Sequence, residues 1–178
     1  MPNHASLARI APPSVYSVVI RAPVRDVWRE ITRTDAPIAC FFNSRMSLGP
    51  GGLAPGTKLA MRTPNGRMTG VVGEILEVVP LRRFSHTFQF TSMDDPPCRV
   101  TYELEEVPEG TRFTLTVSEA QEGSKSLKQM VQGSALICRT LKSVMETGRP
   151  SLGVRALFLI MAVAPAPKRC RSELWPVG

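Results

Sequence analysis

Residues 83–118, RFSHTFQFTSMDDPPCRVTYELEEVPEGTRFTLTVS, contain three segments in which apolar and polar side chains alternate. Alternation with a period of two predicts strands that bury one face. The turns at 94–97 and 108–110 are short, so we expect neighbouring strands to form antiparallel hairpins. The side chains that share the buried face are Phe84, His86, Phe88 and Phe90, then Val100, Tyr102 and Leu104, and finally Phe113, Leu115 and Val117.

The segments before this stretch extend the meander toward the N-terminus. Pro23 favours the start of a helix, and the glycines and prolines over 49–56 favour a loop. Glu74 shares the parity of its apolar neighbours, so it is either a cavity carboxylate or the sign of a β-bulge, and we favour the bulge. The predicted elements are a strand over 14–21, a helix over 24–33, a short helix from Asp35 through Phe41, and strands over 57–62, 66–78 and 81–90.

The segment after this stretch carries the longest helical pattern, over residues 124–147. Its apolar side chains recur at a spacing of three and four residues, which predicts a helix with one buried stripe. Ser124 is suited to the N-cap, and Gly148 followed by Pro150 predicts the end of the helix. The sequence therefore predicts an α+β fold in which a curved antiparallel sheet wraps around a long C-terminal helix.

The length of 178 residues favours a single domain. We expect an N-terminal segment over 1–13, a domain over 14–150, and an apolar helix with a basic tail over 151–178. No apolar run reaches the ~20 residues that a membrane-spanning helix needs, and the N-terminal residues lack the apolar core of an export signal. These features favour a cytoplasmic protein.

Composition argues against two kinds of binding partner. The four cysteines, at positions 40, 98, 138 and 170, form no C-x-x-C pair, so we expect reduced thiols and neither a metal site nor a cofactor. The net charge of +7 raises the question of nucleic-acid binding. However, the basic residues are scattered among acidic ones and are not interleaved with aromatic ones, so we expect no nucleic-acid partner.

Four segments, in order, are similar to those of a known family. They are SVVIRAPVRDVW (17–28), GRMTGVVGEILEVVPLRRF (66–84), VTYELEEVPEGTRFTLTVS (100–118) and QGSALICRTLKSVMETGRP (132–150). On these segments the chain resembles the SRPBCC group, also called START-like or Bet v 1-like, close to proteins like the activator of heat-shock-protein-90 ATPase. The resemblance implies the helix-grip fold, with a hydrophobic cavity between sheet and helix.

The resemblance also defines an expected ligand site. Relatives often carry an aromatic residue after the glycine of the long helix, whereas Gly133 is followed by Ser134, so the site is either roomier or filled by another side chain. His86 is either a general base or ligand anchor, or a hydrogen-bonded core histidine, which we favour. The expected lining is Phe84, His86, Phe88, Phe90, Tyr102, Leu104, Phe113, Leu115, Met130, Ser134, Cys138 and Leu141.

Three functions are consistent with this site. The favoured one is binding of a small apolar or aromatic molecule or a lipid. The alternatives are a cyclase or hydrolase that uses His86 as acid and base, and a co-chaperone-like module that binds another protein or a second copy of itself. Neither a G-x-S-x-G nor an H-E-x-x-H motif is present, so we favour a binding protein over an enzyme.

The tail allows two interpretations. Residues 152–164, LGVRALFLIMAVA, precede the basic stretch PKRCRSELWP, so the tail either lies on an anionic membrane, with Trp175 at the interface, or packs on the domain or a second subunit. We favour packing, through Leu152, Ala156, Leu159 and Val163 with Phe158. If the tail packs near Ser134, we expect Phe158 or Trp175 to replace the missing aromatic side chain.

Overall fold

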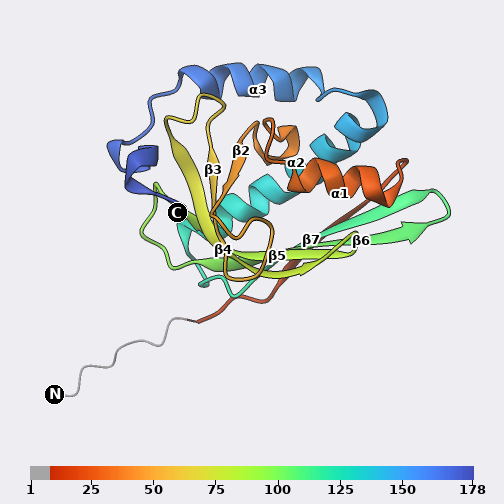
Figure 1. Ribbon diagram of the computed structural model, residues 1–178, viewed down its shortest axis with the longest axis horizontal. Helices are drawn as coiled ribbons and strands as arrows, with labels where there is room; N and C mark the ends of the chain where they lie inside the picture. The colour runs from red at the N-terminus through yellow and green to blue at the C-terminus, as the bar shows by residue number, and fades with distance from the viewer. Residues whose placement is uncertain (1–8) are drawn as a thin grey trace.

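A curved antiparallel sheet wraps around one long helix in the computed structural model, which describes residues 9–178 (Figure 1). The sheet has seven strands in the order β1-β7-β6-β5-β4-β3-β2. Residues 1–8 of the predicted N-terminal segment lie outside the described residues. The strands are β1 (Ser14–Ile20), β2 (Arg45–Leu48), β3 (Lys58–Arg62), β4 (Thr69–Val79), β5 (Arg83–Phe90), β6 (Cys98–Val107) and β7 (Gly110–Ser118).

The helices lie on the concave side of this sheet (Figure 1). Helix α2 contacts β1 and β7 as well as the short turn η1, so its apolar stripe covers the sheet. This architecture confirms the predicted α+β helix-grip class. The helical elements are α1 (Val24–Thr32), η1 (Ala39–Phe41), α2 (Lys125–Thr147), α3 (Leu152–Val163), η2 (Lys168–Cys170) and η3 (Ser172–Leu174).

The strand register brings the predicted buried side chains into rows across the sheet. Phe84 is opposite Tyr102, Tyr102 is opposite Leu115, and Leu115 is opposite Tyr16 on β1. Phe84, Tyr102 and Leu115 are each at most 3% exposed. Such cross-strand rows stabilise a sheet because each side chain contacts its neighbours on the same face.

Two elements near the N-terminus differ from the prediction. The short helix expected from Asp35 through Phe41 is only the single turn η1, because Pro37 restricts the residue before it to extended backbone. Strand β2 was not predicted, because its four residues carry too little pattern. Its pairing with β3, with Met46 opposite Met61, defines it only in the folded chain.

Glu74 lies beside an irregularity in β4, as the favoured interpretation predicted. The pairing of β4 with β5 shifts register between Ile75 and Glu77, and Glu74 is exposed. The backbone N–H of Glu74 donates to Thr87 Oγ1 at 2.8 Å. The bulge interpretation is therefore confirmed, and the alternative of a cavity carboxylate is wrong.

The ends of α2 are formed as the sequence predicts. The Ser124 hydroxyl accepts a hydrogen bond from the N–H of Leu127 at 3.1 Å, which satisfies one of the free donors of the first turn. Gly148 ends the helix with a φ of 77°, in the left-handed region that glycine adopts without strain.

The last residues fold back onto β3 and the start of β4. The guanidinium of Arg62 donates to the carbonyl of Trp175 at 3.1 Å, and the hydroxyls of Thr69 and Ser172 lie 3.0 Å apart. Cys170 is buried beside them. Helix α3 is thus held at both ends, by α2 on one side and by this tail on the other (Figure 1).

Helix α3 turns a different stripe toward the protein from the one expected. The expected stripe, Leu152, Ala156, Leu159 and Val163, is exposed, whereas Val154 is buried. The helix is apolar around nearly its whole circumference, so its sequence pattern could not select a face. The attachment of its two ends decides the face instead.

A polar staple joins the C-terminal end of α2 to the end of β1. The Lys142 ammonium donates to the carbonyl of Val19 and to Glu146, at 2.5 and 2.9 Å. Glu146 also accepts the backbone N–H of Arg21 at 2.9 Å. These hydrogen bonds, that from the Arg21 backbone above all, lower the pKa of Glu146 to about 2.

We predict that this staple makes stability depend on pH in an acidic window. Because the folded pKa of Glu146 lies below its ordinary value of 4.5, its contribution is present above pH 4.5 and is lost as the pH falls toward 2. Thermal melting should therefore show wild type more stable than Glu146→Gln near neutral pH, with the difference shrinking in that window. Glu109→Gln, in the exposed β6–β7 turn, serves as the control. A difference independent of pH would contradict the prediction.

Candidate functional site

A cavity of about 390 Å³ lies between the concave face of the sheet, α2 and α3. This volume is in the range of about 300 to 1,000 Å³ typical of small-molecule sites. The sheet contributes Met61, Gly70, Val71, Phe88, Phe90, Val100, Tyr102 and Leu115, and Ser92 follows β5. The remaining lining is Phe41, Phe42 and Ser44 near η1, Gln129, Met130, Gly133, Ser134 and Ile137 on α2, and Leu157 and Met161 on α3.

The structure divides the twelve expected site residues into two groups of six. The first group lines the cavity and consists of Phe88, Phe90, Tyr102, Leu115, Met130 and Ser134. The second group is absent from the lining and consists of Phe84, His86, Leu104, Phe113, Cys138 and Leu141, all buried.

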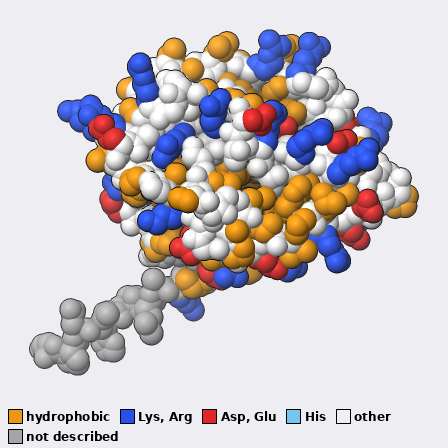
Figure 2. All heavy atoms as spheres, in the orientation of Figure 1, with side chains coloured by type: hydrophobic (Ala, Val, Ile, Leu, Met, Phe, Trp, Pro, Cys, Tyr) orange, Lys and Arg blue, Asp and Glu red, His pale blue; other side chains and the backbone are white. Residues whose placement is uncertain are grey.

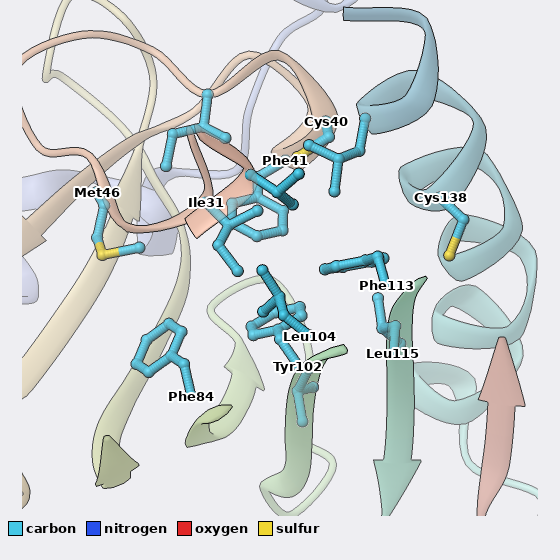
Figure 3. Close-up of a cluster of buried hydrophobic side chains, with 14 of the residues drawn as sticks. Ile31, Cys40, Phe41, Met46, Phe84, Tyr102, Leu104, Phe113, Leu115 and Cys138 are labelled. Carbon is cyan, nitrogen blue, oxygen red and sulfur yellow. The ribbon is translucent and has the colours of Figure 1, made fainter. Parts of the chain in front are cut away.

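Five of the second group, all except His86, belong to the main hydrophobic core, and α1 packs on β6 and β7. Figure 3 shows Phe84, Leu104 and Phe113 pointing toward the same space as Ile31 and Phe41, which come from those two elements. Tyr102 joins the two regions, since its ring lies 5.7 Å from that of Phe84 and 6.0 Å from that of Phe113. The sheet face is therefore filled at one end and open at the other.

The aromatic side chain next to Gly133 is Phe42. A Cβ at Gly133 would lie 3.4 Å from the ring of Phe42, and neither Phe158 nor Trp175 belongs to the lining, so the expectation for those two is wrong. Phe42 has a φ of 54°, a left-handed conformation that costs a residue with a side chain about 1–3 kcal/mol. Sequence gave no signal for this residue except its neighbour Asn43, a type that tolerates such backbone.

No side chain among the described lining residues carries a charge at neutral pH. The polar groups are the side chains of Ser44, Ser92, Gln129, Ser134 and Tyr102. The Ser134 hydroxyl already donates to the carbonyl of Met130 at 2.7 Å, as serines in helices commonly do. Burying a ligand's charge here would be costly because no opposite charge compensates it, so the cavity suits an uncharged ligand.

His86 is fully buried behind this lining. Its Nδ1 lies 2.7 Å from the carbonyl of Thr87 and its Nε2 lies 3.4 Å from the Tyr102 hydroxyl. Since a carbonyl only accepts, Nδ1 carries the proton and Nε2 accepts from Tyr102. The Thr87 carbonyl lies against the backbone of Gly73. This close approach requires glycine, because a Cβ at position 73 would lie 1.8 Å from that oxygen.

Burial keeps His86 neutral. Loss of solvation lowers its pKa from 6.5 to about 4, although the hydrogen bond to Thr87 opposes the shift. Burial also raises the pKa of Tyr102. His86 thus has the geometry of a hydrogen-bonded core histidine, and its partner Tyr102 belongs to the cavity lining.

Burial makes three of the four cysteines poor nucleophiles. Burial raises the pKa of Cys98 and of Cys138 to about 11 and that of Cys40 well above its ordinary value, so these thiols stay protonated. Over residues 9–178, no group of three or more histidine, cysteine, aspartate or glutamate side chains is arranged to hold a metal ion.

Comparison with known proteins identifies relatives of this fold. The family model described as "Activator of Hsp90 ATPase homolog 1-like protein" matches residues 21–146. Protein MLL2253 from Mesorhizobium loti is similar with a TM-score of 0.62 at 18% identity, over 76% of this chain and 97% of that chain. The Aha1 dimer from Colwellia psychrerythraea has a TM-score of 0.62 at 16% identity, over 78% and 98%.

A third similar structure is DynU16, a protein in the dynemicin biosynthetic locus, with a TM-score of 0.61 at 21% identity, over 79% of this chain and 49% of that chain. A search of curated proteins found no match to the sequence. At these identities the solved structures show a shared fold, and they do not transfer a ligand or an activity.

We predict that burial of His86 makes the protein less stable below pH 6.5. Because its folded pKa is lower than its unfolded pKa, the neutral ring favours the folded state above pH 6.5, and this contribution is lost as the pH falls toward 4. The loss is roughly 3 kcal/mol, since each pKa unit corresponds to about 1.4 kcal/mol. Denaturant unfolding of wild type and His86→Gln between pH 4 and 7 measures it.

A direct readout comes from NMR titration of the imidazole in the folded protein. We expect the ring of His86 to remain neutral, with the proton on Nδ1, throughout the range in which a solvated histidine titrates. A His86 ring that titrates near pH 6.5 while the fold stays intact would contradict both the burial and the predicted pH window.

Proposed function

The chain belongs to the family of Activator of Hsp90 ATPase homolog 1-like proteins, and from the cavity of this member we propose that it binds a small, uncharged apolar or aromatic molecule. The observation that carries the proposal is the uncharged lining between sheet and α2. The helix-grip fold is compatible with ligand binding, and this lining favours apolar ligands over charged ones.

The apolar walls are suited to a flat or flexible hydrocarbon. Phe88 and Phe90 meet edge to face with their centroids 4.8 Å apart, so they present both a ring face and a ring edge. Met61, Met130 and Met161 lie on three different elements around them. Methionine side chains adapt to irregular shapes, which supports binding of several related molecules.

The polar groups of the lining supply orientation. The side chains of Ser44, Ser92 and Gln129 and the hydroxyl of Tyr102 offer hydrogen bonds to a hydroxyl, carbonyl or ether group of the ligand. Affinity comes mainly from enclosure, since each 40 Å² of apolar ligand surface removed from water contributes about 1 kcal/mol.

A cyclase or hydrolase that uses His86 is not favoured by this geometry. A general base must lie within hydrogen-bond reach of the proton that it takes, and His86 is absent from the lining.

The Aha1 structure from Colwellia psychrerythraea is a dimer, which supports association of this chain with a second copy. Sedimentation velocity of the purified protein tests that association separately from ligand binding.

We predict that the purified protein binds the neutral fluorescent probe N-phenylnaphthylamine and binds its anionic analogue, anilinonaphthalene sulfonate, at least tenfold more weakly. The sulfonate cannot enter a cavity without an opposite charge at an acceptable cost. Fluorescence titration, with displacement by an unlabelled hydrocarbon, measures both affinities. The proposal fails if the neutral probe does not bind displaceably or if the two probes bind equally.

A pair of variants locates the probe. Ser134→Phe fills the cavity from α2 and should weaken binding of the neutral probe at least tenfold, whereas Gln132→Phe adds the same ring on the exposed side of α2 and should leave binding unchanged. Val71→Trp, which fills the cavity from β4, provides a second obstruction if Ser134→Phe proves unstable. Circular dichroism verifies that each variant is folded. Equal binding by the filled variants would place the probe elsewhere.

A further inference from the structure

The outward side of α3 is the most apolar exposed helix surface of the described chain. Leu152, Leu159 and Val163 are 78%, 73% and 83% exposed, and they recur at a spacing that places them on one side of the helix. Ile160 lies beside them and is also exposed. Large apolar side chains gathered in this way mark a surface that another apolar phase covers.

The charges around this stripe have one sign. Residues 147–172, TGRPSLGVRALFLIMAVAPAPKRCRS, contain five lysines and arginines and no aspartate or glutamate. Along the upper edge of the molecule, where Figure 1 places α3, Figure 2 shows hydrophobic and basic side chains without acidic ones.

Three of the five basic side chains are available to a partner. Arg169 is paired with Asp94, and Arg171 is close to Glu173. Arg149, Arg155 and Lys168 are exposed, and within residues 9–178 they form no ion pair. Arg149 and Lys168 flank α3 at its two ends, and Arg155 lies in its first half.

We infer that α3 docks the protein on an anionic lipid surface, with the helix lying in the plane of the membrane. Leu152, Leu159 and Val163 enter the interface between headgroups and acyl chains, and the three available basic residues contact lipid phosphates or carboxylates. Among residues 9–178, each helix falls short of the length and apolar character that crossing a bilayer requires, and α3 has only 12 residues. Docking in the plane is the arrangement that such a helix allows.

A second copy of the chain fits this surface less well. Two α3 surfaces brought together would bury apolar stripes but would also oppose Arg149, Arg155 and Lys168 with the same residues. No acidic residue lies on α3 to compensate them. A lipid surface supplies the apolar phase and the negative charge together, so charge complementarity favours the membrane.

The opposite side of α3 faces the cavity. Leu157 and Met161 belong to the cavity lining, so this single helix separates the cavity from the surface that docks. Docking would bring the cavity within one helix diameter of the lipid. The inference does not depend on what the cavity binds, because the stripe and its charges act whether or not a ligand is present.

The test is flotation of the full-length protein with phosphatidylcholine vesicles, with and without phosphatidylserine. We expect binding only when phosphatidylserine is present, and we expect it to be lost in 1 M salt, where screening shortens the Debye length to about 3 Å. Arg155→Gln should lower the affinity about fivefold, as the loss of one interfacial basic residue does. Leu159→Ser combined with Val163→Ser should abolish binding without changing thermal stability.

The matched control is Ile10→Ser combined with Val15→Ser. These residues are 61% and 62% exposed and lie outside α3, so the control removes similar apolar surface and should retain wild-type binding. Equal binding to both kinds of vesicle, or binding unaffected by the α3 variants, would overturn the inference. So would a dimer that the α3 variants dissociate, or binding to polyglutamate in the absence of vesicle binding.

Discussion

The position of the Tyr102 ring is the constraint on which the rest of the structure depends. The ring packs within 6.0 Å of those of Phe41, Phe84 and Phe113, so it ties η1 to three strands of the sheet. Its hydroxyl contacts His86, and its remaining surface lines the cavity. Tyr102 therefore lies at the boundary between the hydrophobic core and the cavity. A change in its position would disturb the packing of the core and the shape of the cavity.

The filled and open halves of the sheet follow from how far the covering helices reach. Where α1 and η1 lie over the sheet, Phe84, Leu104 and Phe113 are at most 6% exposed and pack into the core. Beyond Tyr102 the cover consists of α2, with small residues at Gly133 and Ser134, and of α3. Small side chains under a curved sheet leave a void, and Phe42, held in a strained conformation, narrows it without closing it.

Helix α3 combines two roles that are usually assigned to separate elements. Its inner side chains complete the cavity, and its outer side chains are apolar and exposed. A helix that is apolar all round is normally buried on all sides, so an exposed one implies that a further apolar phase completes its burial. The basic residues around it are complementary to a negatively charged partner.

The sequence by itself determined the meander and the long helix, because period-two alternation over 83–118 and the capped stripe over 124–147 are local patterns that each segment carries alone. The helix-grip class followed from the resemblance of four segments to the SRPBCC group. The sequence also placed Phe88, Phe90 and Ser134 on the correct faces. Only the tertiary structure decided that Phe84 and His86 lie in solid core and that Phe42 faces Gly133. It also decided which side of α3 points outward. Those outcomes depend on which element covers which part of the sheet. Such contacts join residues far apart in the sequence, so no local hydrophobic period indicates them.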